Sequence, residues 1–318
     1  MLQYFALSAP LYALVLLGYV LGRWSRWRST WTDWASKFLF AVALPALLFH
    51  VLSDLAALPS VDARLLLAFF GGCFIVFALG RVVAARYFGL EPVAQSTFAL
   101  GGVFSNNVML GLPLAKLTLG PRAIPAVALV IAFNALILWS LASISVEWSR
   151  HGALNLSGLA KTLRGVVTNP LIIAILAGTA FGLTGWQLPH PVEIALAKLA
   201  QFAAPLALLV LGLGLVRYGF ERAWPLCLSI CALKLLAMPL VVWSLAALLG
   251  LPALETHVIV LLASMAVGAN VYLMAIQFQT LQGAIANSLV VSTALAALTT
   301  PLLLSILDAF GPALSGAP

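Results

Sequence analysis

The chain has 318 residues, of which 63% are hydrophobic and 8% are charged, and its mean hydropathy is +1.11. Soluble globular domains carry about 25% charged residues, so this composition excludes a domain whose surface faces water. The net charge of +7 does not indicate nucleic-acid binding, because the basic residues stand at the ends of apolar segments rather than in a patch with interleaved aromatic residues. The chain is therefore predicted to lie in a lipid bilayer.

Apolar segments divide the chain, and each has roughly the 20 residues that an α-helix needs to cross the hydrocarbon core. The pattern predicts an all-α polytopic membrane protein with ten transmembrane helices. In chain order the predicted spans are Tyr4 to Trp24, Trp34 to Leu55, Leu65 to Phe88, Val93 to Leu117, Ala123 to Trp148, Val166 to Trp186, Val192 to Val216, Trp224 to Leu249, Ala253 to Phe278 and Gly283 to Leu307.

The basic residues in the links predict the orientation of the chain. With the N-terminus outside, most of them fall on the cytoplasmic side: Arg23, Arg26, Arg28, Lys37, Arg81, Arg86, Arg150, Lys161, Arg164, Arg217 and Arg222. The opposite side then holds Arg64, Lys116, Arg122 and Lys198. The positive-inside rule accordingly places both termini outside the cytoplasm.

The two halves of the chain share a pattern. The matched pairs are Pro10 with Pro170, Gly18 with Gly178, and Pro45 with Pro205, each 160 residues apart. Asn107 matches Asn270 at an offset of 163 residues. A repeat of five crossings enters its second copy from the opposite side of the membrane, so the pattern predicts two inverted five-helix repeats. We assign residues 1–148 to the first repeat, 149–165 to a short cytoplasmic link and 166–318 to the second repeat.

The fourth and ninth spans are predicted to be broken helices that form the substrate site. In the fourth span, residues that weaken a helix or carry a polar side chain lie at the depth of the lipid: Gly102, Ser105, Asn106, Asn107, Gly111 and Pro113. The ninth span has Gly268 and Asn270 at the corresponding depth. Unwound backbone in a membrane is tolerated where it lines a cavity, and paired interruptions in two repeats indicate a transport site.

The ninth span has no proline near its interruption, so we expect its break to be less sharp than that of the fourth span. The amino ends of half-helices present free amide groups and a partial positive charge, which suit a carboxylate. Asn134 in the fifth span and Gln201 in the seventh are single amides that suit contacts between helices, and Asn134 is also a candidate for the substrate site.

The charged residues inside the spans favour an anionic substrate. The carboxylates stand at or near span ends, whereas Lys234 lies ten residues into the eighth span. A lysine at this depth either faces a cavity as part of the substrate site or pairs with backbone carbonyls. The sequence shows no metal-ligand spacing, phosphate loop or dinucleotide fingerprint, so neither a metal nor a cofactor is expected.

These motifs resemble bacterial members of the auxin efflux carrier family. The resemblance rests on Ala9-Pro10-Leu11-Tyr12, on Leu44-Pro45-Ala46-Leu47-Leu48-Phe49, on the run from Phe104 to Pro113 and on Gly268-Ala269-Asn270. It implies a ten-helix fold similar to that of bile acid sodium symporters, in which helices four and nine cross. Helices 1, 2, 6 and 7 would then form a scaffold, and helices 3–5 and 8–10 a moving transport domain.

The same resemblance implies a carrier in the bacterial inner membrane that transports organic anions such as malonate, malate or auxin by alternating access, as a homodimer held through the scaffold. Coupling to Na⁺ or H⁺ stays open. One alternative is a sodium-coupled symporter of larger bile-acid-like or aromatic acids. An intramembrane enzyme is the alternative of another class, but it would need clustered His, Asp or Glu at lipid depth, and the spans lack such a cluster.

Overall fold

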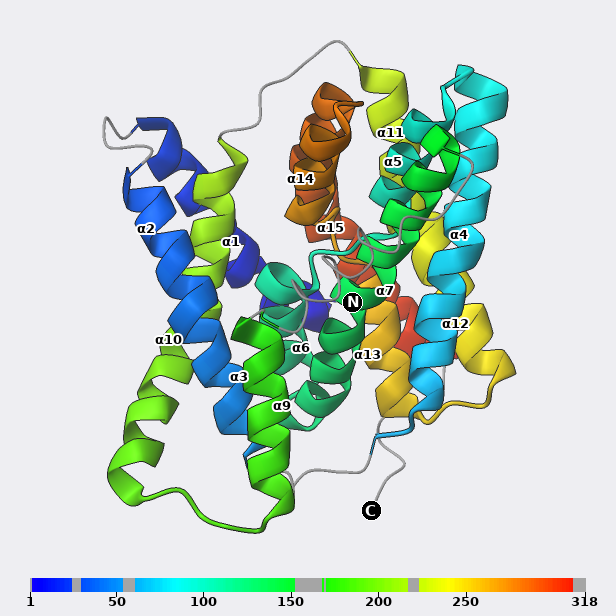
Figure 1. Cartoon of the computed structure of the whole chain (residues 1–318). Helices are drawn as coiled ribbons and strands as arrows, with labels where there is room; N and C mark the ends of the chain where they lie inside the picture. Colours follow the sequence, from blue (N-terminus) through cyan, green and yellow to red (C-terminus); the bar gives the residue numbers. More distant parts are fainter. Residues whose placement is uncertain are drawn as a thin grey trace.

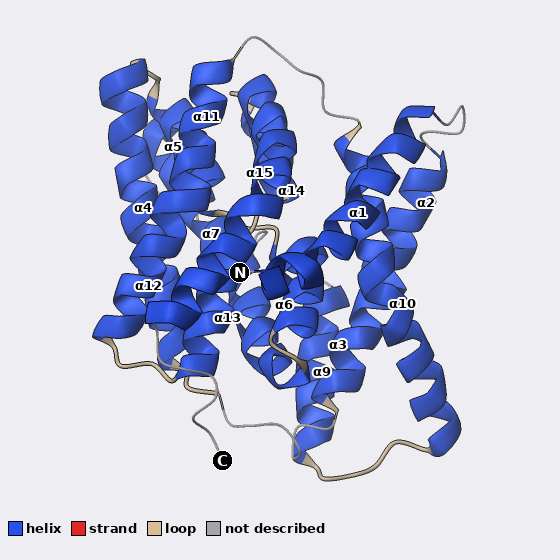
Figure 2. Cartoon of the chain, turned by 180° about the vertical axis from the view of Figure 1, so that it is seen from behind, coloured by secondary structure: helices blue, strands red, loops and turns tan. Residues whose placement is uncertain are grey.

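A computed structural model describes residues 2–24, 30–53, 61–151, 168, 170–216 and 223–310. Most of the predicted link 149–165, and several of the basic residues used for the orientation, lie outside these residues. Within the described part the chain forms helices joined by loops, and every predicted span contains helix (Figures 1 and 2). Five helical segments are long and apolar enough to cross a membrane: Asp33–Leu52, Arg64–Phe88, His190–Leu215, Trp224–Leu248 and Gln282–Ala309. The chain is therefore a multi-pass membrane protein.

The helices pack in two groups that stand on opposite sides of the molecule (Figure 1). The first group contains α1 (Leu2–Trp24), α2 (Thr30–Phe38), η1 (Leu39–Ala43), α3 (Leu44–Leu52), α9 (Pro170–Leu183) and α10 (His190–Leu215). The second group contains α4 (Arg64–Phe88), α5 (Pro92–Val103), η4 (Pro121–Ala123), α7 (Ile124–His151), α11 (Trp224–Ala232), η5 (Leu233–Ala237), α12 (Met238–Leu248), α13 (Ala253–Ala263) and α15 (Gln282–Phe310). The helices α6 (Leu112–Thr118) and α14 (Ala269–Phe278) face the first group.

Glycines allow the helices of the first group to approach closely. A Cβ atom at Gly18 in α1 would lie 2.3 Å from the carbonyl oxygen of Leu209 in α10. At Gly178 in α9 it would lie 2.9 Å from the carbonyl oxygen of Phe49 in α3. A side chain at either position would therefore push the two backbones apart.

Three π-helical segments interrupt the long spans, and each is followed by a proline. The segments η1, η3 (Asn107–Gly111) and η5 end two residues before Pro45, Pro113 and Pro239, respectively. Proline cannot donate to the helical hydrogen bonds, and its ring clashes with the carbonyl four residues earlier, so the preceding turn widens. Such π-turns occur often at functional sites.

The fourth span is broken between α5 and η3. Phe104 is extended, with φ −79° and ψ 104°, and Asn106 has φ −78° and ψ 62° before η3 begins at Asn107. The ninth span is interrupted between the end of α13 at Ala263 and the start of α14 at Ala269. The ninth interruption thus covers more residues than the fourth.

The two interruptions cross and pair with each other. Ser105 and Val267 form an antiparallel bridge, in which the amide of Asn106 donates to Ala266 O at 2.9 Å and the amide of Gly268 donates to Phe104 O at 2.8 Å. The unwound backbone groups of each span are therefore satisfied partly by the other span, as burial in a membrane requires. This explains why the ninth span needs no proline to break.

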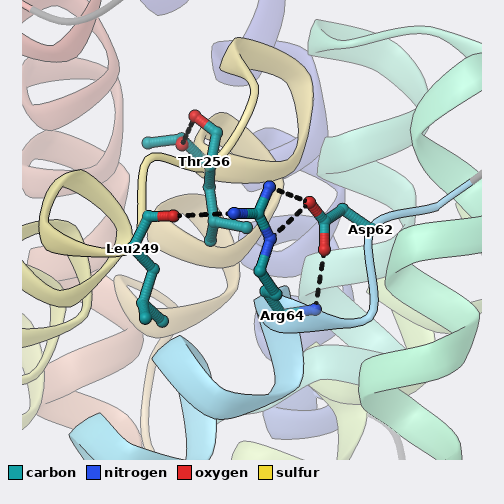
Figure 3. Close-up of polar contacts among 5 residues, drawn as sticks. Asp62, Arg64, Leu249 and Thr256 are labelled. Atoms are coloured by element: carbon teal, nitrogen blue, oxygen red, sulfur yellow. Dashed lines mark hydrogen bonds and ion pairs between the residues drawn. The ribbon is translucent and has the colours of Figure 1, made fainter.

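An ion pair between Asp62 and Arg64 stands at the start of α4, and Arg64 also donates a hydrogen bond to the backbone at the end of α12 (Figure 3). The guanidinium group of Arg64 donates to Asp62 Oδ2 at 2.5 and 2.8 Å and to Leu249 O at 3.1 Å. The hydrogen bonds from the Arg64 side chain and backbone hold the pKa of Asp62 below its ordinary value of 3.8. The pair is solvent-exposed, so we expect it to stabilise the fold only slightly.

Candidate functional site

A cavity of about 330 Å³ lies where the two broken spans cross. Its walls come from the interruptions themselves, from the first turns of η3 and α14, and from η1, α7 and α9. The lining residues are Phe40, Phe104, Ser105, Asn106, Asn107, Val108, Met109, Ile131, Asn134, Leu171, Ile172, Gly268, Ala269, Asn270 and Leu273. The cavity thus lies between the crossing and the first helix group.

Several polar side-chain atoms on the wall are buried and have no hydrogen-bond partner among the described residues. They are Ser105 Oγ, Asn106 Nδ2, Asn107 Nδ2 and Oδ1, and Asn134 Oδ1. A buried amide without a partner costs about 1–3 kcal/mol, so a cluster of them is expected where a ligand supplies the missing partners. The residues that carry these atoms line one cavity, which makes it the best candidate for a binding site.

Two helix amino ends also meet at the cavity. The segment η3 begins at Asn107 and α14 begins at Ala269, and neither has a side-chain hydrogen bond at its N-cap. The first turns of both line the cavity. Free amide groups and the helix dipole give each amino end a partial positive charge, which favours an anion. No Asp, Glu, Lys or Arg is among the lining residues, so these dipoles and the asparagine amides determine the polarity of the described wall.

The structure brings most of the predicted substrate-site residues together on this wall. They are Ser105, Asn106, Asn107, Asn134, Gly268 and Asn270. All are buried except Asn270, which is exposed in the first turn of α14. Lys234 is absent from the lining, and its ammonium group donates to Ala263 O at the end of α13. Gln201, predicted as a buried amide between helices, is exposed on α10, so that prediction was wrong.

The predicted helix-break residues have different local roles. Gly102 lies inside α5, where a Cβ atom would come within 3.0 Å of Leu233 Cβ, so it allows close packing against η5. Gly111 ends η3, and Pro113 lies in the first turn of α6. The backbone leaves the helical conformation at residues 104–106, between α5 and η3, and not at these three positions.

The apolar part of the wall carried no signal in the sequence. The apolar lining residues come from predominantly apolar segments, so their side chains resemble those that face lipid or the core. They include Phe40, Ile131, Leu171 and Ile172. They form the apolar part of the cavity wall around the asparagine amides.

A larger groove of about 630 Å³ lies between α1 and α15. Its walls are nearly all apolar, with Tyr12, Tyr19 and Thr293 as the polar residues on them. No helix amino end and none of the asparagine amides reaches this groove. It therefore offers little that would recognise a charged solute, and the crossing cavity is the better candidate.

Unwound helices that cross in a membrane and line a polar cavity are the arrangement with which many secondary transporters bind their substrates. The fold and the site thus define the class as a membrane transporter. The profile of the family described as "Membrane transport protein" matches residues 4–304, and the chain belongs to this family. The match confirms the resemblance to auxin efflux carriers and identifies a transporter rather than an enzyme.

A related protein of Rhizobium meliloti (strain 1021) has the name "Putative malonate transporter". It is 27% identical to the chain over 307 residues, which cover 95% of the chain and 95% of the relative. The likeness therefore extends through both helix groups and the crossing.

Proposed function

We propose that the chain is a secondary carrier of small organic anions, with malonate and similar short dicarboxylates as the first candidates. The observation that carries the proposal is the cavity in which two uncapped helix amino ends and the unpartnered amides of Asn106 and Asn107 converge without a lining carboxylate. Ligand pockets range over about 300–1,000 Å³, so a cavity at the lower end suits a small solute. The name of the relative agrees with this class.

Alternating access follows from the proposed architecture of two inverted repeats, residues 1–148 and 166–318. The support comes from two contacts that involve repeated glycines. Gly18 packs against Leu209, and Gly178 packs against Phe49. Gly178 lies 160 positions after Gly18, and Leu209 lies 160 positions after Phe49, so the two contacts correspond with the repeats exchanged. Exchanged contacts of this kind are expected from a twofold axis in the membrane plane. The first helix group then serves as the scaffold, and the second moves against it as an elevator or by rocking.

The alternative within transport is a sodium-coupled symporter of larger aromatic or steroid-like acids. The small cavity favours the smaller substrates, whereas the α1–α15 groove has room for a larger apolar body. Uptake of both kinds of acid therefore has to be compared. The proposed location is the bacterial inner membrane, with both termini outside the cytoplasm and a homodimer formed through the scaffold. Accessibility of single cysteines placed in the loops and the mass of the purified protein test these points.

The experiment is uptake into proteoliposomes of purified carrier, with radiolabelled malonate competed by a panel of mono- and dicarboxylates and by a bile acid. Sodium, pH and voltage are varied independently. We expect saturable uptake of short dicarboxylates, with weak competition by the bile acid. Uptake of bile acid alone, or no uptake of any anion above that of protein-free liposomes, would contradict the proposal.

A further inference from the structure

Lys234 is fully buried at the level of the crossing. It lies in η5, the π-helical segment of the eighth span, and its side chain has 0% exposure. The neighbouring Leu233 packs against Gly102 of the broken fourth span. The segment η5 therefore touches α5 through Leu233 and α13 through Lys234.

The ammonium group of Lys234 donates a hydrogen bond to the carbonyl oxygen of Ala263, the last residue of α13. The last carbonyls of a helix have no partner within it, and together they carry a partial negative charge. Lys234 thus places a cation on the carbonyl end of a half-helix at the depth of the membrane. Glu255 lies in the first turn of the same helix, so both ends of α13 face a charge of the favourable sign.

Other polar groups at this break are satisfied without charge. The hydroxyl of Thr300 donates to Ser264 O at 3.2 Å, and the hydroxyl of Ser292 accepts from the amide of Val267 at 3.0 Å. A hydroxyl or amide side chain could also satisfy Ala263 O, at a much lower cost of desolvation than a buried ammonium group. Satisfying Ala263 O therefore does not by itself explain a lysine at this position.

No carboxylate among the described residues forms an ion pair with Lys234. Among the described residues, its ammonium group instead contacts the partial negative charge at the carbonyl end of α13. In transporters with broken helices, the carbonyl ends of half-helices and the unwound carbonyls hold the coupling Na⁺. The ammonium group of Lys234 stands at such a place.

We propose that Lys234 is a positioning residue that acts as the resident cation of the crossing. This inference rests on the proposed function and deepens it. The ammonium group takes the place of a bound Na⁺ at the carbonyl end of α13, holds the ninth break in shape and makes the crossing positive for an anion. The carrier then needs no alkali cation at this position.

The experiment compares the wild type, Lys234→Met and Lys234→Arg in proteoliposomes, with malonate uptake measured in Na⁺, K⁺ or N-methylglucamine. Lys198→Met is the matched control, because Lys198 is exposed on α10. We expect Lys234→Met to lower uptake by at least about tenfold, Lys234→Arg to keep a third or more of it, and Lys198→Met to match the wild type. The wild type should transport equally in the three cations.

A second measurement does not depend on transport or on the folding of a variant. The thermal unfolding of wild-type protein in detergent is recorded in Na⁺ and in N-methylglucamine at equal ionic strength, and we expect the same midpoint. Stabilisation by Na⁺, stimulation of wild-type uptake by Na⁺, or wild-type uptake by Lys234→Met would overturn the assignment of Lys234. If the wild type transports no anion, the proposed function fails, and the unfolding measurement still decides the role of Lys234.

Discussion

The breaks in the fourth and ninth spans share a backbone plan but differ in their side chains. The fourth break leaves the amides of Asn106 and Asn107 buried and without partners at the cavity. At the ninth break, backbone groups are satisfied by Lys234 of η5 and by Ser292 and Thr300 of α15. From this difference we infer a division of roles, in which the fourth span receives the proposed ligand and the ninth span is held in place for it.

With this division, the two breaks present different groups to one solute. A ligand that binds at a twofold axis meets the same groups from both repeats only if the repeats keep the same side chains. Here Asn107 and Asn270 correspond in sequence, yet Asn107 is buried whereas Asn270 is exposed. The predictions below test whether the two breaks differ in function as they do in contacts.

The largest effect on transport is expected from Asn107→Ala. Both polar atoms of its side chain face no protein partner, and a hydrogen bond to a charged ligand is worth about 1.5–3 kcal/mol. The apparent affinity for malonate should fall roughly 10- to 100-fold in uptake assays. Gln201→Ala removes an exposed amide far from the cavity lining and is the control, with unchanged affinity. Equal affinity of the two variants would remove Asn107 from the site.

Gly268→Ala tests the crossing itself. A Cβ atom there would lie 3.0 Å from Phe104 Cδ1 and 3.1 Å from Ser105 O, so the two extended segments would have to move apart. We expect uptake to fall by about tenfold, because small displacements at a binding site carry large penalties. Gly214→Ala makes the same change in α10, where nothing lies within 4 Å, and should leave uptake intact. Full activity of Gly268→Ala would show that the close approach is not needed.

Asn270→Ala should have a smaller effect than Asn107→Ala. Its side chain is exposed at the amino end of α14, so water can replace part of what is lost. We expect affinity for malonate to fall by about three- to tenfold, measured in the same uptake assay. A loss as large as that of Asn107→Ala would argue for equal contributions from the two repeats.

Ser292→Ala should change stability more than transport. It leaves the buried amide of Val267 without its partner, which costs about 1–3 kcal/mol. The midpoint of thermal unfolding in detergent should fall by several degrees, while the affinity for malonate changes by less than about twofold. Ser244→Ala on the exposed face of α12 is the control for both readings. A large loss of affinity without a loss of stability would place Ser292 in the ligand site.

The smallest effect is expected from Arg64→Gln, far from both breaks. The Asp62–Arg64 pair is exposed, and exposed ion pairs contribute little to the free energy of unfolding. Because the pKa of Asp62 is lowered in the folded protein, its contribution is complete above pH 3.8 and is lost as the pH falls through the lowered pKa. Thermal unfolding of wild type and variant should therefore differ little and equally from pH 5 to pH 8. A difference that grows within this range would require another titrating group.

Several parts of the fold and site could be predicted from the sequence because the membrane restricts the choices. Long apolar segments between short polar links have to be helices, and the described residues are helical in each of them. The break in the fourth span was predicted from polar and helix-weakening residues at lipid depth, namely Ser105, Asn106, Asn107 and the following Pro113. The extended backbone lies within one residue of this polar run. Such residues persist there only where they line a cavity.

Other parts depend on contacts between distant residues and left no local signal. The hydrogen bond from Lys234 to Ala263 O joins two spans. From the sequence alone, Lys234 could equally face the cavity or pair with a backbone carbonyl. The ninth span is interrupted without a proline because its backbone is satisfied by Ser292, Thr300 and the fourth span. Apolar wall residues such as Phe40 and Leu171 look like any others in a lipid-facing helix.

The most direct test of the division between the two breaks is an electron cryomicroscopy structure of the carrier with bound malonate. The account predicts density for the dicarboxylate in the crossing cavity, within hydrogen-bond distance of Asn107 and the first amides of α14, with Lys234 still on Ala263. Density in the α1–α15 groove, or a ligand in direct contact with the ammonium group of Lys234, would contradict it.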